Sequence, residues 1–237
     1  MLLWSQVNAH SWVEQLPFVT GNDSSAGGMG FPRGNVPRTD PSFRDDLMSY
    51  IIPPVDRPID VGIQATDLMC KASQQPYNQT KNSPRLTVPL KSSILFWYQE
   101  NGHVTLPQSQ AGKPENRGTV DVHHMWKPNT TEDGQRGQLL GRFNFDDGQC
   151  YQVNNGSLSK SRQDRFPHRP VNPMEADLWC HNTVELPKEL QAGDLFTFYW
   201  VWDWPTAPNV DVNYPDGKSE VYTTCIDIDI ISKPLPP

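Results

Sequence analysis

The sequence predicts an all-β protein, an immunoglobulin/fibronectin-like antiparallel β-sandwich with long loops. Seven segments alternate between apolar and polar residues with a period of two, and no helical period of useful length competes with them. The 23 prolines and 16 glycines are spread along the chain, which is typical of many short strands joined by turns. A chain of 237 residues has the length of one such domain.

The expected strands are bounded by turn residues. In chain order they span residues 59–66, 85–88, 93–99, 118–126, 139–145, 195–204 and 220–232. The strongest is 195–204, in which five aromatic residues fall on one face: Phe196, Phe198, Trp200, Trp202 and Trp204. We expect the first four to form a buried sandwich face instead of a surface for stacking sugars. Trp204, at the strand end beside Pro205, is left open.

A long irregular segment precedes most of these strands. Residues 21–35 are polar and Gly-rich, five prolines follow before residue 60, and only residues 45–52 favour a short helix. Such long excursions in a compact domain are usually functional or held down by packing. We therefore expect this segment on the surface near His10.

The cysteines and glycosylation sequons indicate the secretory pathway. Four cysteines, Cys70, Cys150, Cys180 and Cys225, form an even number without C-x-x-C spacing, which favours two disulfides over a zinc site. Four N-x-[ST] sequons mark candidate glycosylation sites at Asn22, Asn78, Asn129 and Asn155. Because disulfides persist in oxidising compartments, we predict a secreted, extracellular protein.

The first nine residues predict a processing site. Residues 1–9 begin apolar and end in Val7-Asn8-Ala9, a small-residue pattern that signal peptidase accepts. We interpret them as the remnant of a signal peptide, with residues 10–237 as a single copper-binding β-sandwich domain that begins at His10. No other stretch approaches the roughly 20 apolar residues of a membrane span. We expect no membrane association.

The charge of the chain limits its partners. A formal net charge of -7 leaves no basic field to neutralise phosphates, so nucleic acid is a poor partner. An uncharged partner fits better, and we expect a monomer.

His10 carries the chemistry once it becomes the first residue. Its α-amino group and its imidazole can then chelate one metal ion, and a second imidazole would complete a T-shaped set of three nitrogen ligands, which favours Cu(II). His103 is our choice for that imidazole, because it follows a strong strand and a turn glycine in Glu100-Asn101-Gly102-His103-Val104. The alternative interpretation of His103 is a simple turn histidine.

A family resemblance extends this hypothesis. The run Glu220-Val221-Tyr222-Thr223-Thr224-Cys225 resembles the closing strand of the lytic polysaccharide monooxygenases, whose pattern is Gln/Glu-x-Tyr-x-x-Cys. The histidine at the expected cleavage site, the Gly-His after a mid-chain strand and this closing run follow in the family's order. The resemblance implies copper held by His10 and His103, with Tyr222 as the axial residue and Glu220 as the group that orients bound oxygen species. From the residues alone, Tyr222 is equally a core tyrosine and Glu220 a solvated strand-edge carboxylate.

The same resemblance implies the disulfides and the activity. It pairs Cys70 with Cys225 and Cys150 with Cys180. It implies a copper-dependent oxidoreductase that acts on a polysaccharide surface, such as a cellulose- or chitin-like cell wall. The chain also resembles a group of secreted fungal proteins that begin His-Ser-Trp-Val-Glu-Gln, which transfers no function.

Other functions stay open at this point. With the same ligands the protein could be a non-catalytic copper-binding or cell-wall-associated protein, and without metal it could be an adhesion domain. Nucleophilic hydrolysis has little support because the chain lacks a G-x-S-x-G elbow. The carboxylates available for glycoside hydrolysis are Asp146, Asp147, Glu175 and Asp177, although Asp146-Asp147-Gly148 favours a turn.

Overall fold

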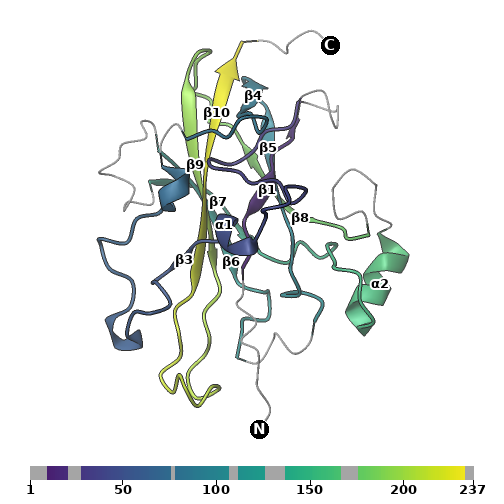
Figure 1. The fold of residues 1–237 in the computed structure, drawn as a ribbon. Coiled ribbons are helices and arrows are strands. Elements are labelled where there is room, and N and C mark those ends of the chain that lie inside the picture. Colours follow the sequence, from purple (N-terminus) through teal and green to yellow (C-terminus); the bar gives the residue numbers. More distant parts are fainter. Residues whose placement is uncertain are drawn as a thin grey trace.

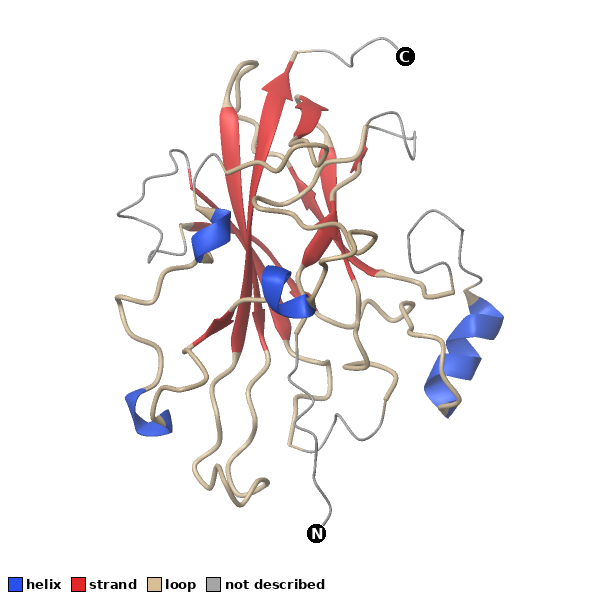
Figure 2. Ribbon diagram, viewed as in Figure 1, coloured by secondary structure: helices blue, strands red, loops and turns tan. Residues whose placement is uncertain are grey.

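Two β-sheets packed face to face form the body of the protein, so the expected all-β sandwich is confirmed (Figure 1). The computed structural model describes residues 10–20, 28–75, 78–106, 112–125, 137–166 and 176–232. Long loops and short helices surround the sheets (Figure 2). Within the described ranges, no helix has the length and apolar character that crossing a lipid bilayer requires.

The smaller sheet is built around one central strand. Strand β5 pairs with β8 along one edge and with the short strands β1 and β2 along the other, all antiparallel. The bounds are β1 (Val13–Gln15), β2 (Phe18–Val19), β5 (Ser93–Tyr98) and β8 (Cys180–Glu185). Since only Ser11 and Trp12 lie between His10 and β1, the pairing of β1 with the end of β5 fixes where His10 lies.

The larger sheet has the order β3-β10-β9-β6-β7, with β4 running parallel to β10. Its bounds are β3 (Ile51–Ile52), β4 (Leu86–Pro89), β6 (Thr119–Met125), β7 (Gln138–Asn144), β9 (Leu195–Asp203) and β10 (Val221–Ile231). The two longest strands, β9 and β10, pair over nine residues, with Tyr222 opposite Trp202.

The alternating aromatic residues of β9 form the centre of the core, as expected. Phe196, Phe198, Trp200 and Trp202 are each no more than 1% exposed, within one cluster that joins the two sheets. Trp204 is 1% exposed and belongs to the same cluster, so the position left open is also core.

The outer face of β9 and β10 is buried as well, under the irregular segment that precedes β4. Tyr199, Val201 and Cys225 pack there against Met69 and Cys70. The segment is anchored by Arg33, whose guanidinium forms two hydrogen bonds to Asp227 on β10, at 2.8 and 2.7 Å. Both side chains are at most 1% exposed. The expectation of a surface segment is therefore wrong for Arg33, because this part of the chain closes a second core.

Two sequence-based assignments need correction. Residues 59–66 form no strand: the 3-10 helix η1 (Ile59–Val61) begins after Pro58, and Gly62 follows with a φ of +60°. Val61 and Ile63 are exposed, so the apolar alternation there reflects no buried face. The helix expected over residues 45–52 ends early, as α1 (Asp45–Met48), because Ile51 and Ile52 pair with β10 as β3.

Several further elements have no recognisable signal in the sequence. These are β1, β2, β3, β8, the helix α2 (Ser157–Arg165) and the 3-10 helix η2 (Ala72–Gln74). The strand β8 reads CHNTVE, with three polar residues directly after Cys180, and α2 reads SLSKSRQDR, without an apolar stripe.

Both implied disulfides are present, Cys70 to Cys225 and Cys150 to Cys180. The sequon asparagines Asn78 and Asn155 are exposed. Asn22, Asn129 and the proposed signal segment 1–9 lie outside the described residues.

The buried pair generates a stability prediction. Replacing Arg33 by Leu leaves Asp227 as an uncompensated buried charge, so we expect the free energy of unfolding to fall by about 3–5 kcal/mol. The double variant Arg33→Leu with Asp227→Leu removes both charges and should recover most of the loss. Urea denaturation followed by tryptophan fluorescence measures both effects.

The matched control is Arg44→Leu, because Arg44 forms an exposed ion pair with Asp46. That variant should unfold like the wild type. Equal destabilisation by Arg33→Leu and Arg44→Leu would contradict the anchoring role of Arg33.

Candidate functional site

The structure brings together His10 and His103, which are 93 residues apart in sequence. The backbone nitrogen of His10 lies 3.3 Å from Nε2 of His103. Two nitrogen ligands held about 2.0 Å from one ion at right angles lie about 2.8 Å apart, so this separation suits a shared metal ion.

His10 offers a second donor atom. Its Nδ1 is buried and has no hydrogen-bond partner among the described residues, whereas its Nε2 lies 2.5 Å from Oδ2 of Asp45. A buried ring nitrogen left without a partner costs stability unless a ligand satisfies it. With the backbone nitrogen and His103, this Nδ1 completes the three nitrogens expected from the sequence. The residues present therefore fit a copper ion, provided that a cut before His10 makes its backbone nitrogen an amine.

A rigid turn holds His103 in place. Asn101 and Gly102 have φ angles of 45° and 81°, in the left-handed region, and they reverse the chain just after β5. The positive φ of Gly102 favours glycine at this position, because other residues rarely adopt it. The Asn101 side chain then donates a hydrogen bond to the carbonyl oxygen of His10 at 2.8 Å and ties the two histidine segments together.

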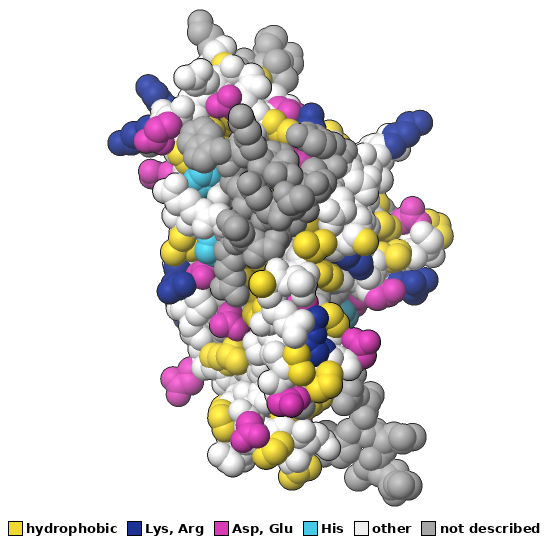
Figure 3. All heavy atoms as spheres, turned by 90° about the vertical axis from the view of Figure 1, so that its left-hand side faces the viewer, with side chains coloured by type: hydrophobic (Ala, Val, Ile, Leu, Met, Phe, Trp, Pro, Cys, Tyr) yellow, Lys and Arg dark blue, Asp and Glu magenta, His cyan; other side chains and the backbone are white. Residues whose placement is uncertain are grey.

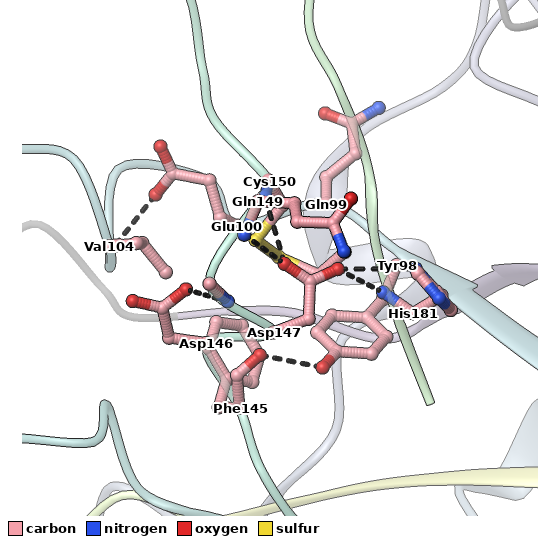
Figure 4. Close-up of a disulfide and its surroundings, with 12 residues drawn as sticks. Tyr98, Gln99, Glu100, Val104, Phe145, Asp146, Asp147, Gln149, Cys150 and His181 are labelled. Carbon is pink, nitrogen blue, oxygen red and sulfur yellow. Dashed lines mark hydrogen bonds and ion pairs between the residues drawn. A yellow bond between two sulfur atoms is a disulfide. The ribbon is translucent and has the colours of Figure 1, made fainter. Parts of the chain in front are cut away.

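The buried side chain of Glu100 stabilises the same turn. Glu100 is 2% exposed, and its carboxylate accepts a hydrogen bond from the N–H group of Val104 at 2.7 Å (Figure 4). It also accepts hydrogen bonds from the N–H group of Gln152 at 2.9 Å and from the hydroxyl of Thr105. Its carbonyl accepts the N–H of His103 at 2.8 Å. The position of His103 is thus set by a buried carboxylate with several partners.

His103 is buried against two tryptophans. Its ring centroid lies 5.3 Å from that of Trp202 and 5.7 Å from that of Trp204, and the residue is 2% exposed. Burial, with the nearby charges of His10 and Lys113, lowers the pKa of His103 to about 3. The imidazole is therefore neutral at pH 7, which is the form that binds a metal.

Tyr222 is connected to His103 through the ring of Trp202. Its ring centroid is 5.2 Å from that of Trp202, which contacts His103. The phenol is 2% exposed, and burial raises its pKa well above the usual range. Its hydroxyl donates a hydrogen bond to Glu220 at 3.4 Å. Tyr222 is thus a core residue of the aromatic stack that supports His103.

Glu220 is not the solvated carboxylate that its strand-edge position suggested. It is 7% exposed and forms ion pairs with Lys113 and, at 3.3 Å, with Lys218. Burial lowers the pKa of Lys113, and Glu220 opposes that shift. The Lys113 ammonium lies 5.1 Å above the Trp204 ring, so these contacts connect Glu220 to His103 through Lys113 and Trp204.

Asp45 and Arg38 are site residues that sequence reasoning missed. Asp45 begins α1, and its carboxylate also lies 3.5 Å from the Arg38 guanidinium. Arg38 forms an ion pair with Glu14 at 2.7 Å and lies over the rings of Trp12 and Phe43. The only available signal was the expectation that this irregular segment lies near His10.

The carboxylates considered for glycoside hydrolysis have structural roles instead. Asp146 forms an ion pair with Arg162 at 2.7 Å, and Asp177 accepts the N–H of Val153 at 2.7 Å. Asp147 accepts the N–H groups of Gln149 and Cys150, both at 2.8 Å, as expected for a turn (Figure 4). Glu175 lies outside the described residues.

A second cluster has the composition of a metal site but not its chemistry. A carboxylate oxygen of Asp147 and the sulfurs of Cys150 and Cys180 lie within 4.8 Å of one another. The two sulfurs are bonded to each other, so neither is a thiolate ligand.

The surface on one face of the molecule is of mixed charge. On the face shown in Figure 3, the described residues mix acidic and basic side chains with small hydrophobic groups and form no broad basic patch. This distribution agrees with the net charge of -7.

Asp147 generates a pH-dependent prediction. Burial opposes its ionised form, but hydrogen bonds from His181 and from backbone N–H groups outweigh burial and lower its pKa below 3.8. Its contribution to stability is therefore present at pH 7 and is lost as the pH falls through this lowered pKa. Asp147→Asn should lower the free energy of unfolding at pH 7 by about 1–3 kcal/mol, with a difference that shrinks below about pH 4.

Denaturant unfolding at pH 7 and pH 3 measures this difference, with the exposed Asp216→Asn as control. A deficit that is the same at both pH values would show that the Asp147 charge is not what stabilises the turn.

The sequence matches one protein family over residues 7–235, and that family is described as a domain of unknown function, DUF7492. No curated protein matches the chain. The matched range contains both histidines, both disulfides and every strand described above, so the site lies inside the family domain. The chain belongs to the DUF7492 family.

Proposed function

We propose that this protein is a secreted copper-dependent oxidoreductase that acts on polysaccharide, with one copper ion held by His10 and His103. The observation that carries the proposal is the 3.3 Å separation between the His10 backbone nitrogen and His103 Nε2. The proposal includes removal of residues 1–9, since an amine binds a metal at neutral pH and a peptide nitrogen retains its proton.

Copper is the metal that best fits these donors. Three nitrogens in a tetragonal arrangement favour Cu(II), whereas structural zinc prefers a tetrahedral set of four ligands. Among the described residues, the available cysteine sulfurs are bound in disulfides and supply no softer ligand.

The side chains around the proposed copper site have different roles. Bound copper supplies one-electron chemistry toward oxygen or peroxide. Glu100 and Asn101 hold the two ligand segments, and Trp202 and Trp204 exclude water from the buried side of His103. Tyr222 supports this stack and supplies a phenol beside Glu220. The resemblance to lytic polysaccharide monooxygenases adds the reaction, oxidation of a carbohydrate C–H bond.

The exposure of the site favours a substrate that is the surface of a polymer. The His10 side chain is 25% exposed and that of Asp45 is 38% exposed, whereas His103 is 2% exposed. The ion would thus be reached from the His10 side, where an insoluble chain can lie against the protein. The disulfides and exposed sequons support secretion, and we propose a monomer without nucleic-acid or membrane partners.

One observation favours a second candidate, copper binding without turnover, as in metal capture or cell-wall association. The resemblance assigns Glu220 to orienting oxygen species, yet this carboxylate is ion-paired with Lys113 and Lys218. A carboxylate held in this way is less available to a bound oxidant.

Copper binding should require both histidine segments. In protein that begins at His10, His103→Ala should weaken Cu(II) binding by at least about 100-fold, because removing an outer-shell group alone costs about 10–100-fold. One extra residue before His10 should weaken binding as sharply, because it removes the chelating amine. Competition titration and the tetragonal paramagnetic resonance signal measure both effects.

The control is His181→Ala, because His181 is partly exposed and pairs with Asp147. It should keep wild-type affinity for copper. Equal affinity in the extended and the processed protein would disprove chelation by the amine.

Turnover separates the two candidates. Copper-loaded protein is incubated with ascorbate, peroxide and a panel of insoluble glycans, and mass spectrometry detects oxidised oligosaccharides. We expect their release by the wild type and none by His103→Ala. Tight tetragonal copper binding without glycan oxidation would favour copper capture. No copper binding after correct processing would overturn both metal functions and leave the adhesion domain.

A further inference from the structure

We propose that Asp45 is a positioning residue that selects the tautomer of His10 and thereby presents Nδ1 to the metal. This inference rests on the proposed function and adds a residue to it. It starts from the 2.5 Å contact between Oδ2 of Asp45 and Nε2 of His10.

The contact determines which ring nitrogen carries the proton. A carboxylate only accepts hydrogen bonds, and a neutral imidazole has one donor and one acceptor nitrogen. In the neutral imidazole, Nε2 at 2.5 Å must therefore be the donor to Asp45, which leaves the lone pair on Nδ1. That Nδ1 is the buried atom without a partner among the described residues. It belongs to the same residue as the backbone nitrogen that faces His103, so the two atoms can chelate one ion.

Asp45 is itself held in position. The Arg38 guanidinium lies 3.5 Å from Oδ1 of Asp45, and Arg38 donates a hydrogen bond of 2.7 Å to the buried Glu14. The Arg38 carbon Cζ lies 4.6 Å from the centre of the Trp12 ring and 5.1 Å from that of Phe43. A packed and charge-paired arginine thus limits the movement of the carboxylate that faces His10.

This arrangement has a chemical consequence. A carboxylate that accepts the second N–H of a ligating histidine fixes the ring orientation and increases the basicity of the ligating nitrogen. Loss of such a partner typically weakens metal binding about 10–100-fold. Through Asp45, the four-residue helix α1 would contribute to metal binding.

The test uses protein that begins at His10, with Cu(II) alone as the probe at one fixed pH. Asp45→Ala should bind Cu(II) about 10–100-fold more weakly than the wild type. Asp45→Glu, which restores a carboxylate, should recover part of the affinity. The matched control is Asp46→Ala, which removes the same charge from the next residue of α1, where the carboxylate forms a solvent-exposed ion pair with Arg44. It should bind like the wild type.

A second readout needs no metal. Nitrogen-15 NMR of the metal-free protein should place the proton of His10 on Nε2 in the wild type and in Asp46→Ala, and on a mixture of both nitrogens in Asp45→Ala. A merely structural role of Asp45 would lower the thermal stability without changing the tautomer. Thermal unfolding of each variant identifies that case. Lower thermal stability of Asp45→Ala without a change of tautomer would overturn the inference.

The outcomes separate the inference from the proposed function. Tight copper binding by the wild type, with Asp45→Ala and Asp46→Ala indistinguishable, overturns the role of Asp45 and leaves the copper site intact. A wild type that binds no copper overturns the proposed function, and the role of Asp45 in it. A change of tautomer together with weaker binding in Asp45→Ala alone supports both.

Discussion

The buried ion pair between Arg33 and Asp227 is the interaction on which the arrangement of the molecule depends. The strands β9 and β10 carry large side chains on both faces, so one sheet packed on one side leaves half of them uncovered. The irregular segment before β4 covers the second face, and the bidentate contact of Arg33 holds it there. A backbone hydrogen bond also holds the segment, because the N–H of Arg33 donates to the carbonyl oxygen of Cys225 on β10. Cys225 in turn forms a disulfide with Cys70.

The same covering segment builds one side of the histidine site. After Arg33 it passes through Arg38 and reaches α1, which brings Asp45 to His10. The opposite side comes from the turn after β5, and the floor comes from the aromatic residues of β9 and β10. These three parts of the chain therefore meet the N-terminal segment that carries His10, and none of them forms the site alone.

Local patterns in the sequence were enough for the long strands and not for the contacts between segments. The alternation from Phe196 to Trp202 identifies a buried face because each side chain is apolar in its own right. The strand β8 was missed because its burial depends on β5, and the apolar alternation near Ile63 misled because no strand pairs with it. The pairing of His10 with His103 followed from the chemistry of a free terminal histidine and a family resemblance. Asp45 and the lysine partners of Glu220 had no such signal, since ion pairs between distant segments leave no periodicity.

The buried Glu100 has a consequence for how an ion would enter. Its hydrogen bonds reach both the turn that carries His103 and the distant Gln152, so folding of the polypeptide alone fixes the turn. A ligand that meets a turn already ordered loses little conformational entropy on binding, and more of the interaction energy becomes affinity. The half of the proposed site that carries His103 would in this sense be preorganised by Glu100, a carboxylate outside the proposed set of metal ligands.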